Sequence, residues 1–283
     1  MPRKPGPTLR RRKLVKELVA ARAASGMTLS ALGAEIDLDG SAISKIEKGQ
    51  QGLTVRNIKA IGRATGLSKA KIDGLVLLAA DDKNYEDWLV EFRGTMPDWF
   101  ELYPELEQDA DQIWTYSAEL VEGLFQTPAY AESIIRTGLP HITDDQLRRW
   151  IDLRIARQAL LDRDDPPLLH VILNEAVLRR PVGGQATMRK QIRHMAELAR
   201  RSHVTIQVLP FTAGAHPGMK SGFYLLRFPE GFDDMDCVYL ENFNGNVWQE
   251  RPDHVAAYTE VFTRQQALAL SPEKSIKFLD SLV

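Results

Sequence analysis

The sequence predicts a mainly α-helical protein of two domains, a five-helix domain over residues 1–80 and a larger α+β domain with a small sheet over residues 81–283. Three observations predict this class. Residues 26–49 have the pattern of two short helices joined by a turn, strand-like segments begin only after residue 166, and the charge is divided between the two parts. The length of 283 residues fits two domains of about 150 residues each.

The division of charge separates the first 80 residues from the rest. Residues 1–80 hold 15 Lys or Arg against 6 Asp or Glu, a balance of +9, whereas the remainder holds 21 against 32, a balance of −11. Attraction to phosphate is therefore concentrated in the N-terminal part. The acidic remainder is expected to face solvent or a partner.

Residues 28–36 predict the first of the two short helices. Thr28 is the expected N-cap, and Leu32 and Ile36 form one apolar stripe. The segment Asp37-Leu38-Asp39 then interrupts the helical spacing. Asp37 can occupy the left-handed backbone conformation that such a turn requires.

Residues 39–48 predict the second helix, with Asp39 as its cap and Ile43 and Ile46 pointing inward. Its outward face carries small residues at the N-terminal end and lysines at the C-terminal end. A helix that enters the major groove needs this profile, because small residues allow close approach and lysine reaches base or phosphate acceptors. The outward residues are Gly40, Ser41, Ser44, Lys45 and Lys48.

The ending Ile43-Ser44-Lys45-Ile46-Glu47-Lys48-Gly49 resembles that of the XRE, or lambda-repressor-like, helix-turn-helix regulators. The chain departs from the family pattern at Leu29, where glutamine is usual, and at Asp37, where glycine is usual. The resemblance implies a compact five-helix DNA-binding domain. The alternative is a helical hairpin with no DNA-binding role.

The expected DNA contacts follow from this resemblance and from the basic residues around the hairpin. A homodimer would place two recognition helices about 34 Å apart on double-stranded DNA with a pseudo-palindromic site. The basic run at 10–13 is either a backbone contact or a solvated helix end. The candidate DNA-binding residues are Thr28, Gly40, Ser41, Ala42, Ser44 and Lys45, together with Arg10, Arg11, Arg12, Lys13, Lys48, Arg56 and Asn57.

Three further helices complete the N-terminal domain. The first covers residues 8–24, with Leu14 and Leu18 inward. Another covers residues 54–64 and a last one residues 68–80. The expected inner residues of the 54–64 helix are Val55, Ile58 and Ile61.

The second domain is expected to begin with helices. An aromatic stripe runs through residues 85–100, and an acidic helix is expected over residues 101–122, with Leu102, Leu106, Ile113, Tyr116 and Leu120 inward. A helix starting at Thr127-Pro128 and another over residues 144–161 follow.

Strands are expected after Pro166-Pro167, at 168–173, 204–209, 222–228 and 237–241. Between and after them the spacing predicts helices at 175–180, 186–200, 252–270 and from 271 to the end. The single cysteine, Cys237, lies in an apolar run and is expected in the core.

This second region resembles the uncharacterised domain that follows an XRE-type helix-turn-helix in many actinobacterial regulators. The blocks that carry the resemblance lie at 123–131, 154–161, 174–184, 204–218 and 238–241, and one departure is Glu122, where proline is common. The resemblance implies a sensor or partner-binding domain that takes a small partner protein or small-molecule effector, in some cases in an antitoxin-like arrangement.

The sequence lacks the usual signs of a cofactor or metal site. None of the six histidines forms an HExxH pair, and neither a P-loop nor GxGxxG occurs, so no cofactor, no metal and no catalytic residue are expected. Charged groups do follow a predicted strand at Glu175 and Arg179, which form either a ligand site or an ion pair that holds strand to helix. His216 lies in a loop that could act as a lid.

Three classes of function compete. The first is a sequence-specific DNA-binding regulator in the cytoplasm, with no apolar run that would span a membrane. The alternatives are an antitoxin-like protein that binds a small partner protein, and an enzyme in residues 88–283. The enzyme would need a nucleophile with a base and an orienting group, and the sequence shows none.

Overall fold

The computed structural model describes residues 7–49, 51, 53–79, 89–92, 94–243 and 245–283. The chain divides into two compact units, Lys4–Asp87 and Trp88–Val283. The boundary expected at residues 80 and 81, and residues 85 and 88 of the aromatic stripe, lie outside the described residues. Each unit is described by itself below.

The N-terminal unit contains five helices, α1 (Pro7–Ala24), α2 (Leu29–Glu35), α3 (Gly40–Glu47), α4 (Val55–Ala64) and α5 (Lys69–Leu78). Four of them begin at a side-chain cap that accepts a hydrogen bond from a backbone N–H three residues ahead, which satisfies one of the free donors of the first turn. The caps are Thr28, Asp39, Thr54 and Ser68.

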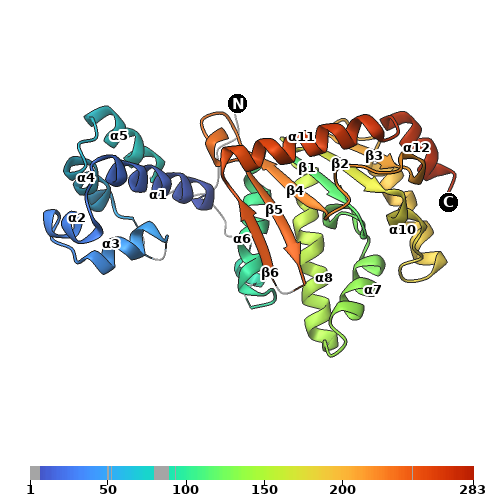
Figure 1. The fold of residues 1–283 in the computed structure, drawn as a ribbon. Coiled ribbons are helices and arrows are strands. Elements are labelled where there is room, and N and C mark those ends of the chain that lie inside the picture. The colour runs from blue at the N-terminus through green and yellow to red at the C-terminus, as the bar shows by residue number, and fades with distance from the viewer. Residues whose placement is uncertain (1–6, 50, 52, 80–88, 93, 244) are drawn as a thin grey trace. The chain divides into compact units, whose positions relative to one another are not determined.

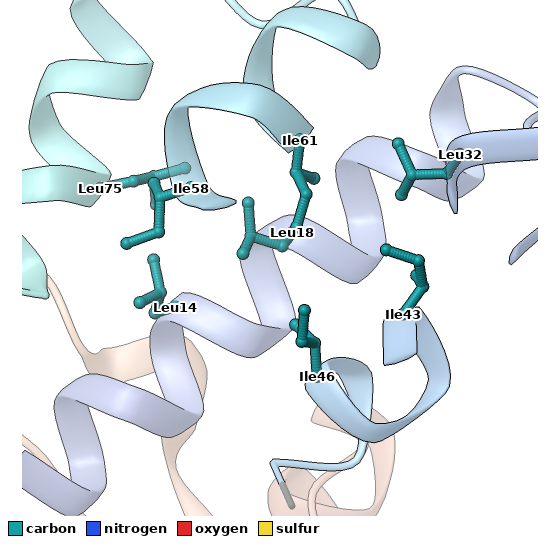
Figure 2. Packing of buried hydrophobic residues seen from close by; sticks show 8 residues of the cluster. All are labelled: Leu14, Leu18, Leu32, Ile43, Ile46, Ile58, Ile61 and Leu75. Atoms are coloured by element: carbon teal, nitrogen blue, oxygen red, sulfur yellow. The ribbon is translucent and has the colours of Figure 1, made fainter. Parts of the chain in front are cut away.

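One apolar cluster holds these helices together, and Figure 2 shows its side chains converging from all five of them. Val55 was expected inward but is 44% exposed; it is the first residue of α4, one turn before the buried Ile58. The buried members are Leu14, Leu18, Leu32, Ile43, Ile46, Ile58, Ile61 and Leu75.

The C-terminal unit is built on a six-stranded mixed sheet in the order β3-β2-β1-β4-β5-β6. The first three strands of this unit are parallel, and the others pair antiparallel. The strands are β1 (Gln112–Ser117), β2 (Leu168–Asn174), β3 (Val204–Leu209), β4 (Phe223–Arg227), β5 (Cys237–Asn242) and β6 (Gly245–Gln249).

Helices cover both faces of this sheet (Figure 1). Phe223 of β4 packs against Tyr258 of α11 with ring centroids 5.0 Å apart, and its neighbour Tyr224 packs against Tyr103 of α6 at 5.2 Å on the other face. The helices are α6 (Asp98–Asp109), α7 (Pro128–Gly138), α8 (Asp144–Gln158), α9 (Glu175–Arg179), α10 (Gln185–Leu198), α11 (Pro252–Leu268) and α12 (Pro272–Asp280), and the 3₁₀ turns are η1 (Val90–Phe92), η2 (Gly123–Phe125), η3 (Ala159–Asp162), η4 (Phe211–Ala213) and η5 (Asp233–Met235).

The expected helix over residues 101–122 is wrong. The helix α6 ends at Asp109, and residues 112–117 form β1, which lies inside the sheet between β2 and β4. Leu120, expected inward, is 44% exposed. The strand forms because Ile113, Trp114 and Thr115 favour a pleated, two-sided environment, and the sheet provides neighbours on both edges.

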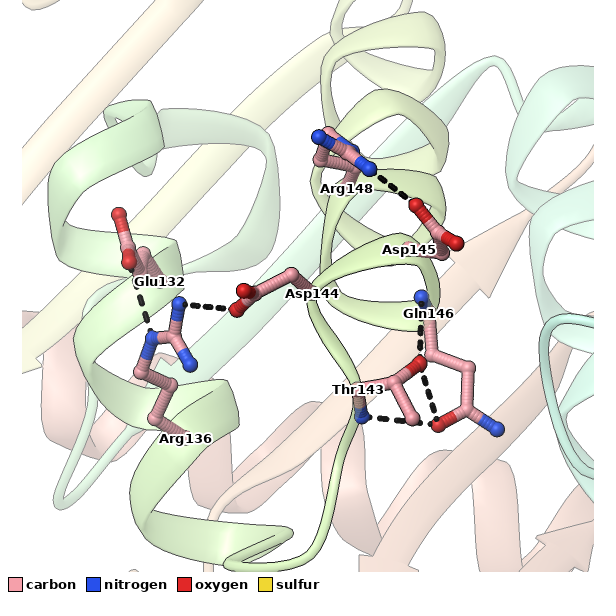
Figure 3. Close-up of polar contacts among 7 residues, drawn as sticks. All are labelled: Glu132, Arg136, Thr143, Asp144, Asp145, Gln146 and Arg148. Carbon is pink, nitrogen blue, oxygen red and sulfur yellow. Dashed lines mark hydrogen bonds and ion pairs between the residues drawn. The ribbon is translucent and has the colours of Figure 1, made fainter.

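The predicted fold class, mainly α with an α+β C-terminal part, is confirmed. Cys237 is fully buried, as predicted. The start of α8 carries a capping box in which Thr143 and Gln146 exchange hydrogen bonds, and Figure 3 shows Arg136 of α7 bonded to both Glu132 and Asp144 beside it. Within the described part of the chain, no helix is both long and apolar enough to cross a bilayer.

Candidate nucleic-acid interface

The recognition helix α3 is fixed at its start by Asp39. The Asp39 carboxylate accepts from the Ala42 N–H at 2.7 Å and from the Ser41 hydroxyl at 2.6 Å. These hydrogen bonds lower the pKa of Asp39. The cap therefore stays ionised at neutral pH and complements the positive end of the helix dipole.

The turn before α3 depends on a close backbone approach at Gly33. A Cβ on Gly33 would lie 2.5 Å from the Leu38 carbonyl oxygen, and the Leu38 N–H donates to the Gly33 carbonyl at 2.9 Å. Asp37 has a φ of 59°, the left-handed conformation expected from the sequence. The turn thus tolerates aspartate where the family has glycine, but Gly33 has no room for a side chain.

Two isoleucines set which side of α3 faces outward. Ile43 and Ile46 are 0% and 1% exposed and belong to the apolar cluster. Ser41, Lys45 and Lys48 are exposed on the opposite side. Ala42 and Ser44 are half-buried, so the exposed face is narrower than the predicted one.

Gly40 lies against α2 and not on the open face of α3. A Cβ at this position would lie 3.1 Å from the Ser30 Oγ and 3.2 Å from the Ser30 Cα. Its small size therefore serves the contact between the two helices of the hairpin. The base contact expected of Gly40 stays a prediction.

An ion pair that the sequence analysis missed holds the far end of α3. Arg22 Nε donates to Glu47 Oε1 at 2.5 Å and Nη2 donates to Oε2 at 2.8 Å, while Nη1 donates to the Met27 carbonyl at 2.9 Å. The hydrogen bond that Arg22 donates to Glu47 raises the pKa of Arg22. The sequence does show Glu47 in the motif ending, but its spacing does not reveal which residue pairs with it.

The basic run on α1 is less available than predicted. Lys13 pairs with Glu17 at 3.5 Å, and only 16% of its side chain is exposed. Arg11 donates to the Gly49 carbonyl just after α3, while Arg10 and Arg12 are half-buried. Lys13 is therefore oriented along α1, as i,i+4 pairs are, and Arg11 braces the end of the recognition helix.

The start of α4 gives the remaining predicted contacts. Arg56 is exposed and Asn57 is half-buried, and the Asn57 N–H donates to the Thr54 hydroxyl at 3.1 Å. Thr28 is exposed, and its hydroxyl accepts from the Ala31 N–H at 3.1 Å. Both threonines therefore act as caps, and Arg56 places an exposed positive charge at this helix end.

The candidate ligand residues of the C-terminal unit divide into two places. Glu175 accepts from Arg179 with Oε1 and from the Phe211 N–H with Oε2 at 2.9 Å, so both of its oxygens are used. This geometry favours an ion pair that holds strand to helix over a ligand site. His216 lies beside Tyr116, with 3.4 Å between His216 Nε2 and the Tyr116 hydroxyl.

The arrangement of a capped, outward-facing basic helix on a five-helix core defines a helix-turn-helix domain of the XRE type. Comparison with protein families agrees: a family described as "Helix-turn-helix" matches residues 18–72, which supports a DNA-binding regulator. The family described as "Domain of unknown function (DUF5753)" matches residues 100–281. Because this match takes in most of the chain, the protein belongs to the DUF5753 family. Comparison with curated proteins and with solved structures yields no match.

Proposed function

We propose that the protein is a sequence-specific transcriptional repressor in the cytoplasm that binds a pseudo-palindrome as a homodimer through α3. The supporting observation is the exposed Ser41, Lys45 and Lys48 on a helix held at both ends, by Asp39 and by Glu47. A reading helix must be rigid to place side chains within hydrogen-bond reach of base edges.

We expect Lys45→Ala to relax sequence preference by about 1–3 kcal/mol at one base pair, because a lysine at a base edge discriminates between bases. Arg56→Ala should weaken all sequences alike, because a phosphate contact carries no sequence information. Competition gel shifts with promoter fragments beside its own gene measure both effects.

The matched control is Lys69→Ala, which removes an exposed positive charge from α5, a helix that packs against α1 and α4. This variant should bind as the wild type does. The proposal fails if the wild-type protein forms no complex that resists competitor DNA.

For the C-terminal domain we propose an effector- or partner-binding role and no catalytic activity. The support is the division of charge along the sequence, in which an acidic domain follows a basic one. Pull-down with the full chain identifies a small partner protein, and a thermal-shift screen with metabolites identifies an effector. An antitoxin-like role would appear as a tight complex with one small protein that releases the DNA.

A further inference from the structure

The connection between β3 and β4 runs over the carboxyl ends of β1 and β2. In the sheet order β3-β2-β1-β4, these two strands lie between the strands that the connection joins. Residues 210–222 must therefore cross the ends of both. Open sheets with parallel strands bind ligands outside the carboxyl ends, near the point where the strand order reverses. Here β1 has a parallel neighbour on one side and an antiparallel one on the other.

A chain of polar groups lies beneath this connection. Asn174 Nδ2, at the end of β2, donates to the Tyr116 hydroxyl at 3.2 Å. The same hydroxyl lies 3.4 Å from His216 Nε2, and His216 Nδ1 lies 3.5 Å from Gln265 Nε2 on α11. The strand ends, the connection and α11 therefore meet at His216.

Gln265 fixes the connection against α11. It is 0% exposed, and a Cβ on Gly218 would lie 2.1 Å from its Nε2, so only glycine allows this approach. Among the residues that the structure describes, none donates to Gln265 Oε1. A buried acceptor without a donor is rare in a packed interior, and a bound water is one explanation for it.

A hollow of about 410 Å³ opens beside this chain. The connection and α11 line it with Ala215, His216, Pro217, Arg264, Ala267 and Leu268. Four of these side chains are apolar. Arg264 is 66% exposed, its pair Glu260 lies 3.7 Å away, and no described residue accepts a hydrogen bond from its guanidinium. The hollow thus has an apolar wall beside the Arg264 guanidinium, whose N–H groups can donate to a ligand.

We propose that this hollow binds a small carboxylate with a short apolar tail, an inference that rests on the effector-binding role proposed above. Arg264 binds the carboxylate, since a guanidinium matches the two oxygens of a carboxylate. Ala215, Pro217, Ala267 and Leu268 cover the tail, and His216 lines the same hollow. A cationic ligand is disfavoured because it offers no acceptor to the Arg264 guanidinium.

The test is a titration of the full chain with hexanoate, followed by NMR of ¹³C-labelled histidine Cε1–H groups. The His216 signal is assigned with His216→Gln. We expect hexanoate to shift the His216 signal more than those of the other histidines, and hexylammonium, which has the same tail and the opposite charge, to leave it unchanged. Hexanol reports binding by the tail alone.

Arg264→Gln should weaken hexanoate binding about tenfold, the loss of one charge-assisted hydrogen bond. The matched control is Arg251→Gln, which removes an exposed arginine that is paired with Asp253 outside the hollow. Ala267→Trp, which fills the hollow, should abolish binding.

The proposal is overturned if hexanoate leaves the His216 signal unchanged, if hexylammonium shifts it equally, or if Arg264→Gln binds as the wild type does. Gel shifts on the same preparation distinguish this result from failure of the DNA-binding proposal. If the protein binds hexanoate but no operator, only the DNA-binding proposal is refuted. If it binds operator but no hexanoate, only the ligand-binding proposal is refuted.

Discussion

Glu122 lies in an environment very different from that of a surface glutamate. It is 2% exposed, and its Oε1 accepts from the Leu124 N–H at 3.2 Å. Burial and the nearby Glu107 raise its pKa from 4.5 to about 7, while Arg157 acts in the opposite direction. The φ of −50° at this position is close to the value that a proline ring imposes, so the turn accepts either residue.

Glu122→Gln should therefore change how stability depends on pH. Since the folded pKa of Glu122 exceeds the unfolded one, its protonated form stabilises the fold below pH 4.5, and this contribution is lost as the pH rises from 4.5 to about 7. The variant should be more stable than the wild type at pH 8 by up to about 3 kcal/mol, and similar to it at pH 4.5. Thermal melting at the two pH values measures this.

The control for this experiment is Glu119→Gln, a nearby glutamate whose side chain is 68% exposed and pairs with Arg180. It should change stability by less than about 1 kcal/mol, as exposed pairs do. An equal gain at pH 8 in both variants would mean that general charge, and not the burial of Glu122, is responsible.

At the scale of helices and strands, local sequence patterns were enough to predict the N-terminal unit. The caps Thr28, Asp39, Thr54 and Ser68 act on the backbone only three residues ahead, so the sequence contains both partners. In contrast, β1 continues the helical spacing of α6 and is recognisable only from the strands beside it. The strand β6 was not predicted because its apolar pattern is weak. It is recognisable only from its pairing with β5.

The same limit applies to the candidate sites. The outward face of α3 could be predicted from the helical spacing of its own residues. His216 could be named as a candidate because it lies in a loop. The Arg22–Glu47 pair spans 25 residues, and the Tyr116–His216 contact spans 100, so neither follows from sequence spacing. The contact of Gly40 with Ser30 could not be predicted either, because it depends on how the hairpin closes.

Glu47→Gln should loosen the C-terminal half of α3. The substitution keeps the shape of the side chain but removes its charge and one acceptor oxygen, so it weakens a pair whose side chains are only 19% and 15% exposed. We expect a loss of about 1–2 kcal/mol, read as faster hydrogen exchange at the Ile43 and Ile46 amides.

A double-mutant cycle with Arg22→Met separates the pair from other effects. If Arg22 and Glu47 act as one clamp, the double variant is about as unstable as either single one. Additive losses would show that each residue stabilises the unit by independent contacts, and the clamp would be the wrong description.

For the whole molecule, the division of charge determines how DNA binding responds to salt. The chain carries a net charge of −2, yet its first 80 residues have a balance of +9. Affinity should therefore fall with salt as it does for a basic protein, because each phosphate contact releases condensed counterions. Net charge alone would predict almost no salt dependence.

The slope of log affinity against log salt tests this in full. Arg56→Ala should reduce the slope by about 0.9, the value for one lost phosphate contact. Arg251→Gln removes an exposed arginine from the C-terminal unit, where it pairs with Asp253, and should leave the slope unchanged. If both variants lowered the slope equally, the phosphate contacts would extend over both units, and the acidic domain would have to touch the DNA as well.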